Sequence, residues 1–217
     1  MILAYHRVNP YYKDDVLTVS PENFKRQIEY LLKKGLKFVS SQEYIPHTYL
    51  LPKEARGKRK EILITFDDGY ADNLCYAIPI LERFNIKPLI FLTVNYIGSS
   101  NIFSRYKDKE KDRLLNWQEV QEMSEQGIIF GSHSLSHPHL SLLDDKKLWE
   151  EVSLSKKIIE DKTGKKILYF CYPYGDFSER VIEKVKLAGY KNAFVTPPKG
   201  KKIKENDYTL LRTGIYG

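Results

Sequence analysis

The stretch ITFDDGY, residues 64–70, ends an apolar run with two adjacent carboxylates and a glycine. Residues 62–66 have the length and apolar character of a buried strand. Asp67 and Asp68 follow this strand directly. Like charges side by side raise each other's pKa, and burial increases the effect. A carboxylate pair in this position therefore needs a chemical reason.

Composition indicates one folded domain. The chain has 217 residues, of which 42% are apolar and 29% charged, and its formal net charge is +7. This apolar content is enough for a sizeable core. No apolar run approaches the roughly 20 residues of a membrane span. The segment after Met1 is too short for a signal peptide, so we expect a protein made without a leader or trimmed of one.

Much of the positive charge lies in two basic runs, KEARGKRK (53–60) and KGKKIK (199–204). They indicate either two solvated loops or contact with an acidic surface such as anionic lipid. No zinc finger or RNP-type strand accompanies them, so no nucleic-acid partner is predicted. Cys75 and Cys171 are too few for a disulfide framework.

Short apolar runs alternate with amphipathic stretches along the whole chain. Strands are predicted at 2–8, 38–39, 62–66, 89–94, 128–130, 167–169 and 193–195. Helices are predicted at 20–35, 73–85, 116–127, 146–164 and 178–189. This order predicts an α/β fold with a mostly parallel sheet, either open or closed into a barrel. The long polar segment 96–113 is predicted to be a functional or a mobile loop.

A second motif, GSHSLSHPHL (131–140), holds three of the five histidines. His133 and His137 are four residues apart, so one helical turn would point both imidazoles the same way. Pro138 limits this helix to an isolated turn. The spacing suits zinc, which binds imidazole nitrogen and carboxylate oxygen. The alternative is a histidine-rich turn without a ligand.

Both motifs are predicted at the carboxyl ends of parallel strands, the edge where α/β folds collect their sites. One aspartate and two histidines would make a three-ligand metal site with open positions. The cation would neutralise one carboxylate, and the other would stay ionised nearby and accept a proton. Gly69 would let the chain turn tightly beneath them.

A third stretch, FCYPYGDFS (170–178), contains a turn signal after a predicted strand. Either it only connects strand to helix, or its backbone N–H groups face an oxyanion at the same sheet edge. Ser132, Ser134 and Ser136 leave a serine hydrolase as a rival interpretation, but the sequence has no Gly-x-Ser-x-Gly elbow.

Taken together, TFDDG (65–69), HSLSH (133–137) and YPYG (172–175) resemble the motifs of the polysaccharide deacetylases, carbohydrate esterase family four. The resemblance covers nearly all of residues 1–217. It implies a single-domain, irregular (β/α) barrel with about seven parallel strands. It also implies that Asp67 is the catalytic base, and that Tyr174, next to Pro173, binds the oxyanion through its backbone N–H.

The same resemblance makes Asp68, His133 and His137 the ligands of one divalent ion. Zinc is expected, and cobalt or nickel would also suit these ligands. His139 is expected to be a supporting residue only.

Two departures from the family pattern stand out. The family usually has an arginine that orients the base three residues before the tyrosine, and here that position is Cys171. The late Leu-x-His motif, which supplies the general acid, is absent. His6, at a predicted strand end, resembles the acid of the biofilm poly-N-acetylglucosamine deacetylase branch. Protonation of the leaving amine requires such a donor.

The resemblance thus implies metal-dependent removal of N-acetyl groups from an N-acetylglucosamine polymer, with poly-β-1,6-N-acetylglucosamine the expected substrate. Peptidoglycan or chitin-like oligomers are the alternatives, as is a carbohydrate-binding pseudoenzyme, which the missing arginine favours. An extracellular or cell-surface monomer is expected. The stretch YIPHTYLLP (44–52) is predicted to be a helix packed on the barrel or, alternatively, an exposed apolar and basic patch that docks on a membrane or a partner protein. Peripheral contact with an anionic membrane or cell wall is expected as well.

Overall fold

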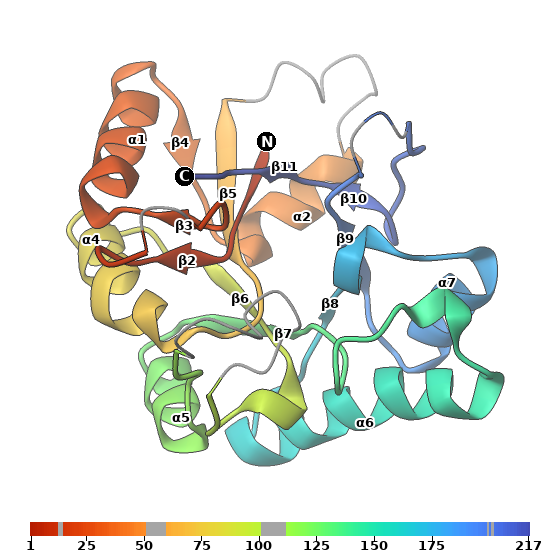
Figure 1. Ribbon diagram of the computed structural model, residues 1–217. Helices are drawn as coiled ribbons and strands as arrows, with labels where there is room; N and C mark the ends of the chain where they lie inside the picture. Colours follow the sequence, from red (N-terminus) through yellow and green to blue (C-terminus); the bar gives the residue numbers. More distant parts are fainter. Residues whose placement is uncertain (13–14, 51–59, 101–111, 199, 201) are drawn as a thin grey trace.

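The chain folds into a nearly closed barrel of parallel strands with helices around its outside (Figure 1). The computed structural model describes residues 1–12, 15–50, 60–100, 112–198, 200 and 202–217, apart from the side chains of 46–50. The strands are β1 (Ile2–Tyr5), β2 (Arg7–Val8), β3 (Thr18–Val19), β4 (Lys37–Phe38), β5 (Glu61–Phe66), β6 (Leu89–Leu92), β7 (Ile129–Ser132), β8 (Tyr169–Cys171), β9 (Asn192–Val195), β10 (Leu210–Leu211) and β11 (Thr213–Gly214).

The barrel strands run in the order β10-β9-β8-β7-β6-β5-β1-β11, and every pair in this order is parallel. β4 pairs with β5 outside the order. The prediction of a single-domain (β/α) barrel is confirmed. The order holds eight strands rather than about seven, because β10 and β11 are only two residues long each and leave no periodic signal in the sequence.

The barrel almost closes between β10 and β11, which are consecutive in the chain but end opposite sides of the strand order. We call this place the barrel seam. Arg212 is the one residue between the two strands, and its N–H donates to the carbonyl of Val195 at 2.9 Å. The N–H of Ile215 donates to Ala4 at 2.9 Å and extends the β1–β11 pairing.

The first predicted strand, 2–8, is wrong in one respect: it breaks at His6 into β1 and β2. After the break the chain leaves the barrel, and β2 pairs with β3 in a separate two-stranded sheet. Arg7 is fully buried there, with its Nε 3.0 Å from the Asp72 carboxylate. The break puts His6 at the end of a barrel strand.

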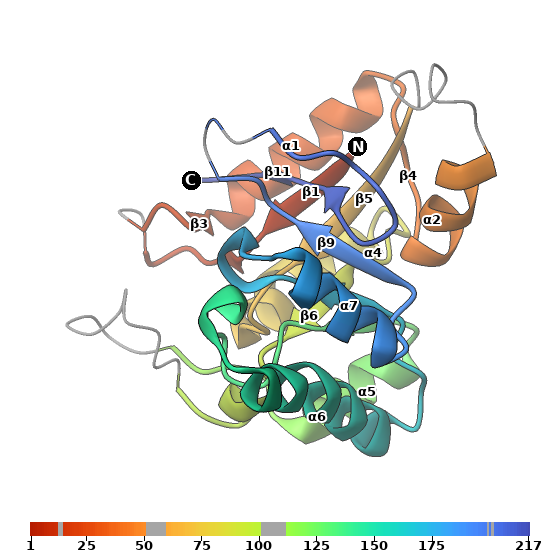
Figure 2. The same cartoon turned by 90° about the vertical axis from the view of Figure 1, so that its right-hand side faces the viewer.

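The helices that cover the barrel are α1 (Pro21–Lys33), α2 (Ser41–Leu50), α4 (Ile78–Glu82), α5 (Trp117–Glu125), α6 (Asp145–Thr163) and α7 (Glu179–Leu187), seen from a second side in Figure 2. A π-helix, η1 (Asn73–Ala77), precedes α4, and short 3₁₀ turns follow several strands, among them η5 (Pro173–Gly175). Capping side chains begin α1, α5, α6 and α7: Ser20, Asn116, Asp144 and Ser178.

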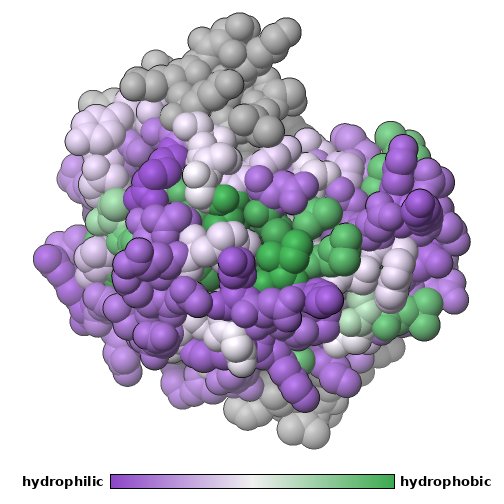
Figure 3. Space-filling model, turned by 90° about the horizontal axis from the view of Figure 1, so that it is seen from below, coloured by the Kyte–Doolittle hydropathy of each residue, from purple (hydrophilic) through white to green (hydrophobic). Residues whose placement is uncertain are grey.

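Parts of three predicted surface segments lie outside the described residues. The stretch 44–52 is helical as far as Leu50, and its last two residues lie outside them, as do 53–59 of the first basic run and 101–111 of the predicted loop. Within the described residues, no helix is long and apolar enough to cross a membrane. The face seen from below gathers apolar side chains in its middle, bordered by hydrophilic ones (Figure 3).

Candidate active site and metal centre

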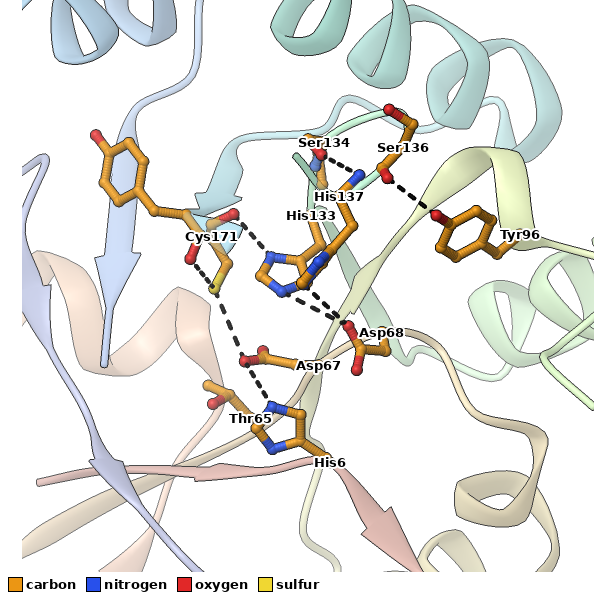
Figure 4. Close-up of polar contacts among 12 residues, drawn as sticks. His6, Thr65, Asp67, Asp68, Tyr96, His133, Ser134, Ser136, His137 and Cys171 are labelled. Carbon is orange, nitrogen blue, oxygen red and sulfur yellow. Dashed lines mark hydrogen bonds and ion pairs between the residues drawn. The ribbon is translucent and has the colours of Figure 1, made fainter. Parts of the chain in front are cut away.

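Three predicted ligand residues lie together at the carboxyl ends of β5 and β7 (Figure 4). The Asp68 Oδ1 atom is 3.7 Å from His133 Nε2 and 3.5 Å from His137 Nε2. Tetrahedral zinc ligands at bond lengths of roughly 2.1 Å lie about 3.4 Å apart, so these separations fit a shared ion. All three side chains are buried. The set of one carboxylate and two imidazoles therefore fits a divalent transition metal.

The backbone fixes which nitrogen of His133 faces the cluster. Its Nδ1 lies 2.8 Å from the carbonyl oxygen of Cys171, and a carbonyl can only accept a hydrogen bond. The Nδ1 atom therefore carries the proton. This leaves the Nε2 lone pair directed at the Asp68 side, the tautomer that a metal-binding histidine needs.

The predicted helical turn from His133 to His137 is wrong. No helix forms there; instead Ser134 and His137 take left-handed backbone conformations, with φ of 66° and 61°. Glu151 of α6 holds this loop by accepting from the N–H groups of Leu135 and Ser136, both at 2.9 Å. The two imidazoles thus converge because the loop is bent, and α6 supplies the anchor.

The serine hydroxyls of this motif have structural partners. Ser132 bonds to Ser155 at 2.8 Å, Ser134 accepts from the His137 N–H at 3.0 Å, and the Ser136 hydroxyl donates to Glu151. These contacts stabilise the histidine loop, which does not favour the serine-hydrolase interpretation.

Asp67 lies beside the metal cluster and is held by Arg212, a residue that the sequence analysis missed. Arg212 Nη1 is 2.7 Å from Asp67 Oδ1, and Nη2 is 2.6 Å from Oδ2. Burial by itself would raise the pKa of Asp67, but the guanidinium outweighs it, and the pKa is held well below its usual value. The carboxylate is therefore ionised and has a fixed orientation.

Cys171 occupies the position where the family usually has its base-orienting arginine. Its thiol lies against the Arg212 guanidinium, with Nη2 to Sγ at 3.0 Å, and 3.9 Å from Asp67 Oδ2. Burial raises the pKa of this thiol, which keeps it neutral. Arg212 reaches the same carboxylate from the barrel seam instead. The small side chain at 171 leaves room for it.

The signal that could have indicated Arg212 is its context. TLLRTGIYG (209–217) places a lone arginine inside an apolar run, and such a residue is seldom buried without a carboxylate partner.

His6 faces Asp67 from the other side. Its Nε2 is 4.0 Å from Asp67 Oδ2, and its side chain is 20% exposed. The Asn73 side-chain amide donates to the His6 carbonyl at 2.9 Å and fixes the strand break. His6, Asp67, His133 and His137 all line one pocket of about 310 Å³.

Tyr174 stands at the edge of this pocket in a left-handed conformation, with φ of 58°. Its ring stacks on the His139 ring, with 4.2 Å between the ring centroids, and lies edge-to-face with the His137 ring at a centroid distance of 4.5 Å. Pro173 is buried in the same turn. Asp68, Ser134, His137 and Tyr174 all have positive φ, and such backbone strain clusters at functional sites.

The parallel barrel, with this side-chain cluster at the carboxyl ends of its strands, agrees with the resemblance to the polysaccharide deacetylases. The sequence model of the polysaccharide deacetylase family matches residues 54–193. The chain belongs to the polysaccharide deacetylase family.

Individual relatives are distant. YxkH of Bacillus subtilis (strain 168), provisionally described as a polysaccharide deacetylase, is 26% identical over 214 residues, covering 99% of this chain and 70% of YxkH. The poly-beta-1,6-N-acetyl-D-glucosamine N-deacetylase of Staphylococcus aureus (strain MRSA252) is 25% identical over 206 residues, covering 90% of this chain and 67% of that protein.

The solved structure of BA0330 from Bacillus anthracis, also provisionally described as a polysaccharide deacetylase, is 26% identical with a TM-score of 0.74. The match covers 99% of this chain but only 64% of BA0330.

Proposed function

We propose that the protein removes N-acetyl groups from an N-acetylglucosamine polymer with one divalent metal ion, and that poly-β-1,6-N-acetylglucosamine is the substrate. The observation that carries the proposal is the position of Asp67, fixed by Arg212 between His6 and the Asp68–His133–His137 cluster. The Staphylococcus aureus relative acts on this polymer by its name, which supports the choice of substrate.

Asp68, His133 and His137 would hold the ion, with zinc the expected metal and cobalt or nickel as substitutes. When bound, the ion would polarise the acetyl carbonyl and acidify a water molecule. Asp67 then accepts a proton as the water oxygen attacks the carbonyl carbon. The low pKa of Asp67 ensures that it is ionised, and Arg212 fixes the orientation of its carboxylate.

The remaining steps need a hydrogen-bond donor to the oxyanion and a general acid for the leaving amine. The Tyr174 backbone N–H lies in the turn at the pocket edge and donates to the developing oxyanion. His6, protonated, gives its proton to the amide nitrogen as the carbon–nitrogen bond breaks. The Asp67 carboxylate at 4.0 Å favours the imidazolium form of His6. The products are acetate and a free amine on an intact polymer.

An acetylated polymer of this kind lies outside the cell membrane, so an extracellular or cell-surface location is part of the proposal. Exposed lysines such as Lys202 and Lys204 of the second basic run would favour contact with an anionic cell wall.

The test is mass spectrometry of acetylated glucosamine oligomers after incubation with the zinc-loaded protein. Loss of acetyl groups without chain cleavage is expected, fastest for β-1,6-linked oligomers and abolished by a chelator. Asp67→Asn should lose at least about 10²-fold in rate while it retains the metal. Faster turnover of β-1,4-linked oligomers would show that a chitin-like or peptidoglycan polymer, and not the β-1,6-linked one, is the substrate. No acetyl loss with zinc, cobalt or nickel would indicate a carbohydrate-binding pseudoenzyme.

A further inference from the structure

We infer that Tyr216 is a sugar-stacking residue that binds the polymer unit next to the one being deacetylated. The inference rests on the proposed function, because it concerns how a polymer reaches that site. Tyr216 lines the same pocket as His6 and Asp67, and 52% of its surface is exposed.

The parallel pairing of β11 with β1 places Tyr216 beside the catalytic centre. Leu3 pairs with Thr213 and Ala4 with Gly214, and the Ile215 N–H bonds to the Ala4 carbonyl. Continuing this register two residues sets Tyr216 level with His6 on the neighbouring strand. A ring at this level lies next to the proposed proton donor.

The ring is seated by its surroundings even though it is exposed. The Gly217 N–H donates to the Val16 carbonyl at 3.1 Å, so the backbone is bonded on both sides of Tyr216. The ring also lies across Gly214: a Cβ added there would be 2.6 Å from the Tyr216 hydroxyl oxygen. An aromatic ring ordered before binding costs little conformational entropy when a ligand stacks on it.

The pocket itself is too small for a polymer segment. Its volume of about 310 Å³ is at the lower end of the range for ligand sites and suits one acetylated sugar. Neighbouring sugar units must therefore lie on the rim. The rim offers flat apolar surfaces: Tyr174 after β8, Pro197 and Pro198 after β9, and Tyr216 after β11.

β-Linked N-acetylglucosamine matches such a rim chemically. Its ring substituents are equatorial, so each face presents axial C–H groups to an aromatic surface, while the edges carry the polar groups. Tyr174 is 49% exposed but already stacks on His139. Tyr216 has no such ring partner among the described residues, and a sugar face fits on it.

The test is calorimetric binding of N-acetylglucosamine and of its β-1,6-linked pentamer to the zinc-loaded protein, in the inactive Asp67→Asn background. Tyr216→Ala is expected to weaken pentamer binding by about 5- to 10-fold, in line with the contribution of one aromatic stack, and to leave monomer binding unchanged. Tyr216→Phe should retain the affinity.

Two further variants separate stacking from a general effect. Gly214→Ala keeps the ring but displaces it, so it should weaken pentamer binding as Tyr216→Ala does, with thermal melting used to show that the protein is folded. Tyr30→Ala removes a ring that is 59% exposed on α1, outside this pocket, and should change nothing. Equal losses for monomer and pentamer, or no loss for either, would overturn the inference alone. If Asp67→Asn with Tyr216 intact binds no oligomer and the wild-type protein deacetylates none, the proposed function falls as well.

Discussion

The Arg212 guanidinium makes two hydrogen bonds to the Asp67 carboxylate, Nη1 to Oδ1 at 2.7 Å and Nη2 to Oδ2 at 2.6 Å, although the two residues are 145 positions apart in the chain. Planar two-point pairs of this kind fix orientation as well as charge. Arg212 also donates to the Thr65 hydroxyl at 3.0 Å, on the strand that carries Asp67. The proposed base is thus oriented by the barrel seam.

Removing Arg212 should therefore impair the base and leave the metal ligands in place. In Arg212→Ala the buried carboxylate loses its countercharge, so the pKa of Asp67 rises. We expect kcat to fall by about 10²-fold and the acidic limb of the kcat/KM profile to move to higher pH. Arg212→Lys keeps the charge but not the two-point geometry and should be intermediate. An acidic limb that stays in place in Arg212→Ala would contradict this role.

Metal binding should depend on the cluster and not on the third histidine of the motif. His133→Ala, His137→Ala and Asp68→Asn are each expected to lose bound zinc, as measured by elemental analysis after dialysis. His139→Ala is the matched control, because its ring stacks on Tyr174 outside the ligand set, and it should retain the metal. Zinc retained in the His133→Ala, His137→Ala double variant would refute the site.

Chelation should lower thermal stability even without substrate. A ligand that binds only the folded state stabilises it by about 2.7 kcal/mol at a hundredfold excess over its Kd. Differential scanning calorimetry of wild-type protein with and without zinc should therefore show a lower Tm after chelation. The His133→Ala, His137→Ala double variant should show the same Tm in both conditions, and a zinc-dependent shift there would place the ion elsewhere.

His6 should matter more for amides than for esters. An amine leaves only when it is protonated, whereas an aryl ester has a good leaving group, so His6→Ala should lose kcat mainly on the acetylated oligomers. We expect a loss of about 10²-fold on amides, with metal content unchanged. His139→Ala serves as the histidine control. Equal losses on both substrate types would remove His6 from the acid's role.

Asp72 should make stability fall as the pH rises. Burial raises the pKa of Asp72 to about 6, against the opposing effect of the Arg7 guanidinium 3.0 Å away. The unfolded chain titrates near pKa 3.9, so the folded state binds this proton more tightly. The contribution of protonated Asp72 to the free energy of unfolding is at most about 3 kcal/mol. It is present in full below about pH 4 and is lost as the pH rises through about 6.

Urea denaturation between pH 4 and pH 7 checks this. Asp72→Asn should show a smaller decline in the free energy of unfolding over that range than wild type. Asp161→Asn changes an exposed aspartate on α6 and should follow the wild-type curve. If the free energy of unfolding of Asp72→Asn declined as much as that of wild type, other groups would be responsible for the pH dependence.

The sequence was sufficient to predict those site residues that lie close to the end of a strand. Asp67, Asp68 and His133 directly follow apolar runs, so the strand ends and the sheet edge could be predicted from local patterns. His137 was also predicted to lie with them, but the predicted cause, a helical turn, was wrong. The left-handed loop that places His137 depends on Glu151, which lies in the following helix α6. A spacing of four residues cannot distinguish a helical turn from a bent loop.

The apolar context of Arg212 could indicate a buried arginine, but its pairing with Asp67 could not be predicted from local patterns. β10 and β11 are two residues long and have no periodicity, and nothing in the local pattern links residue 212 to residue 67. Only closing the barrel brings them together. The departure at Cys171, which favoured a pseudoenzyme, therefore has a physical answer that depends on tertiary structure.

The barrel seam also means that Arg212 is synthesised after both aspartates and all the histidines of the proposed site. A nascent chain that has reached residue 200 already contains both aspartates and every histidine of the proposed site, but not the guanidinium that neutralises Asp67. Its buried carboxylate has no countercharge until residues 210–214 emerge from the ribosome and dock between β9 and β1. A chain that stops short of the seam would therefore lack the residue that orients the proposed base, even though its metal ligands are already present.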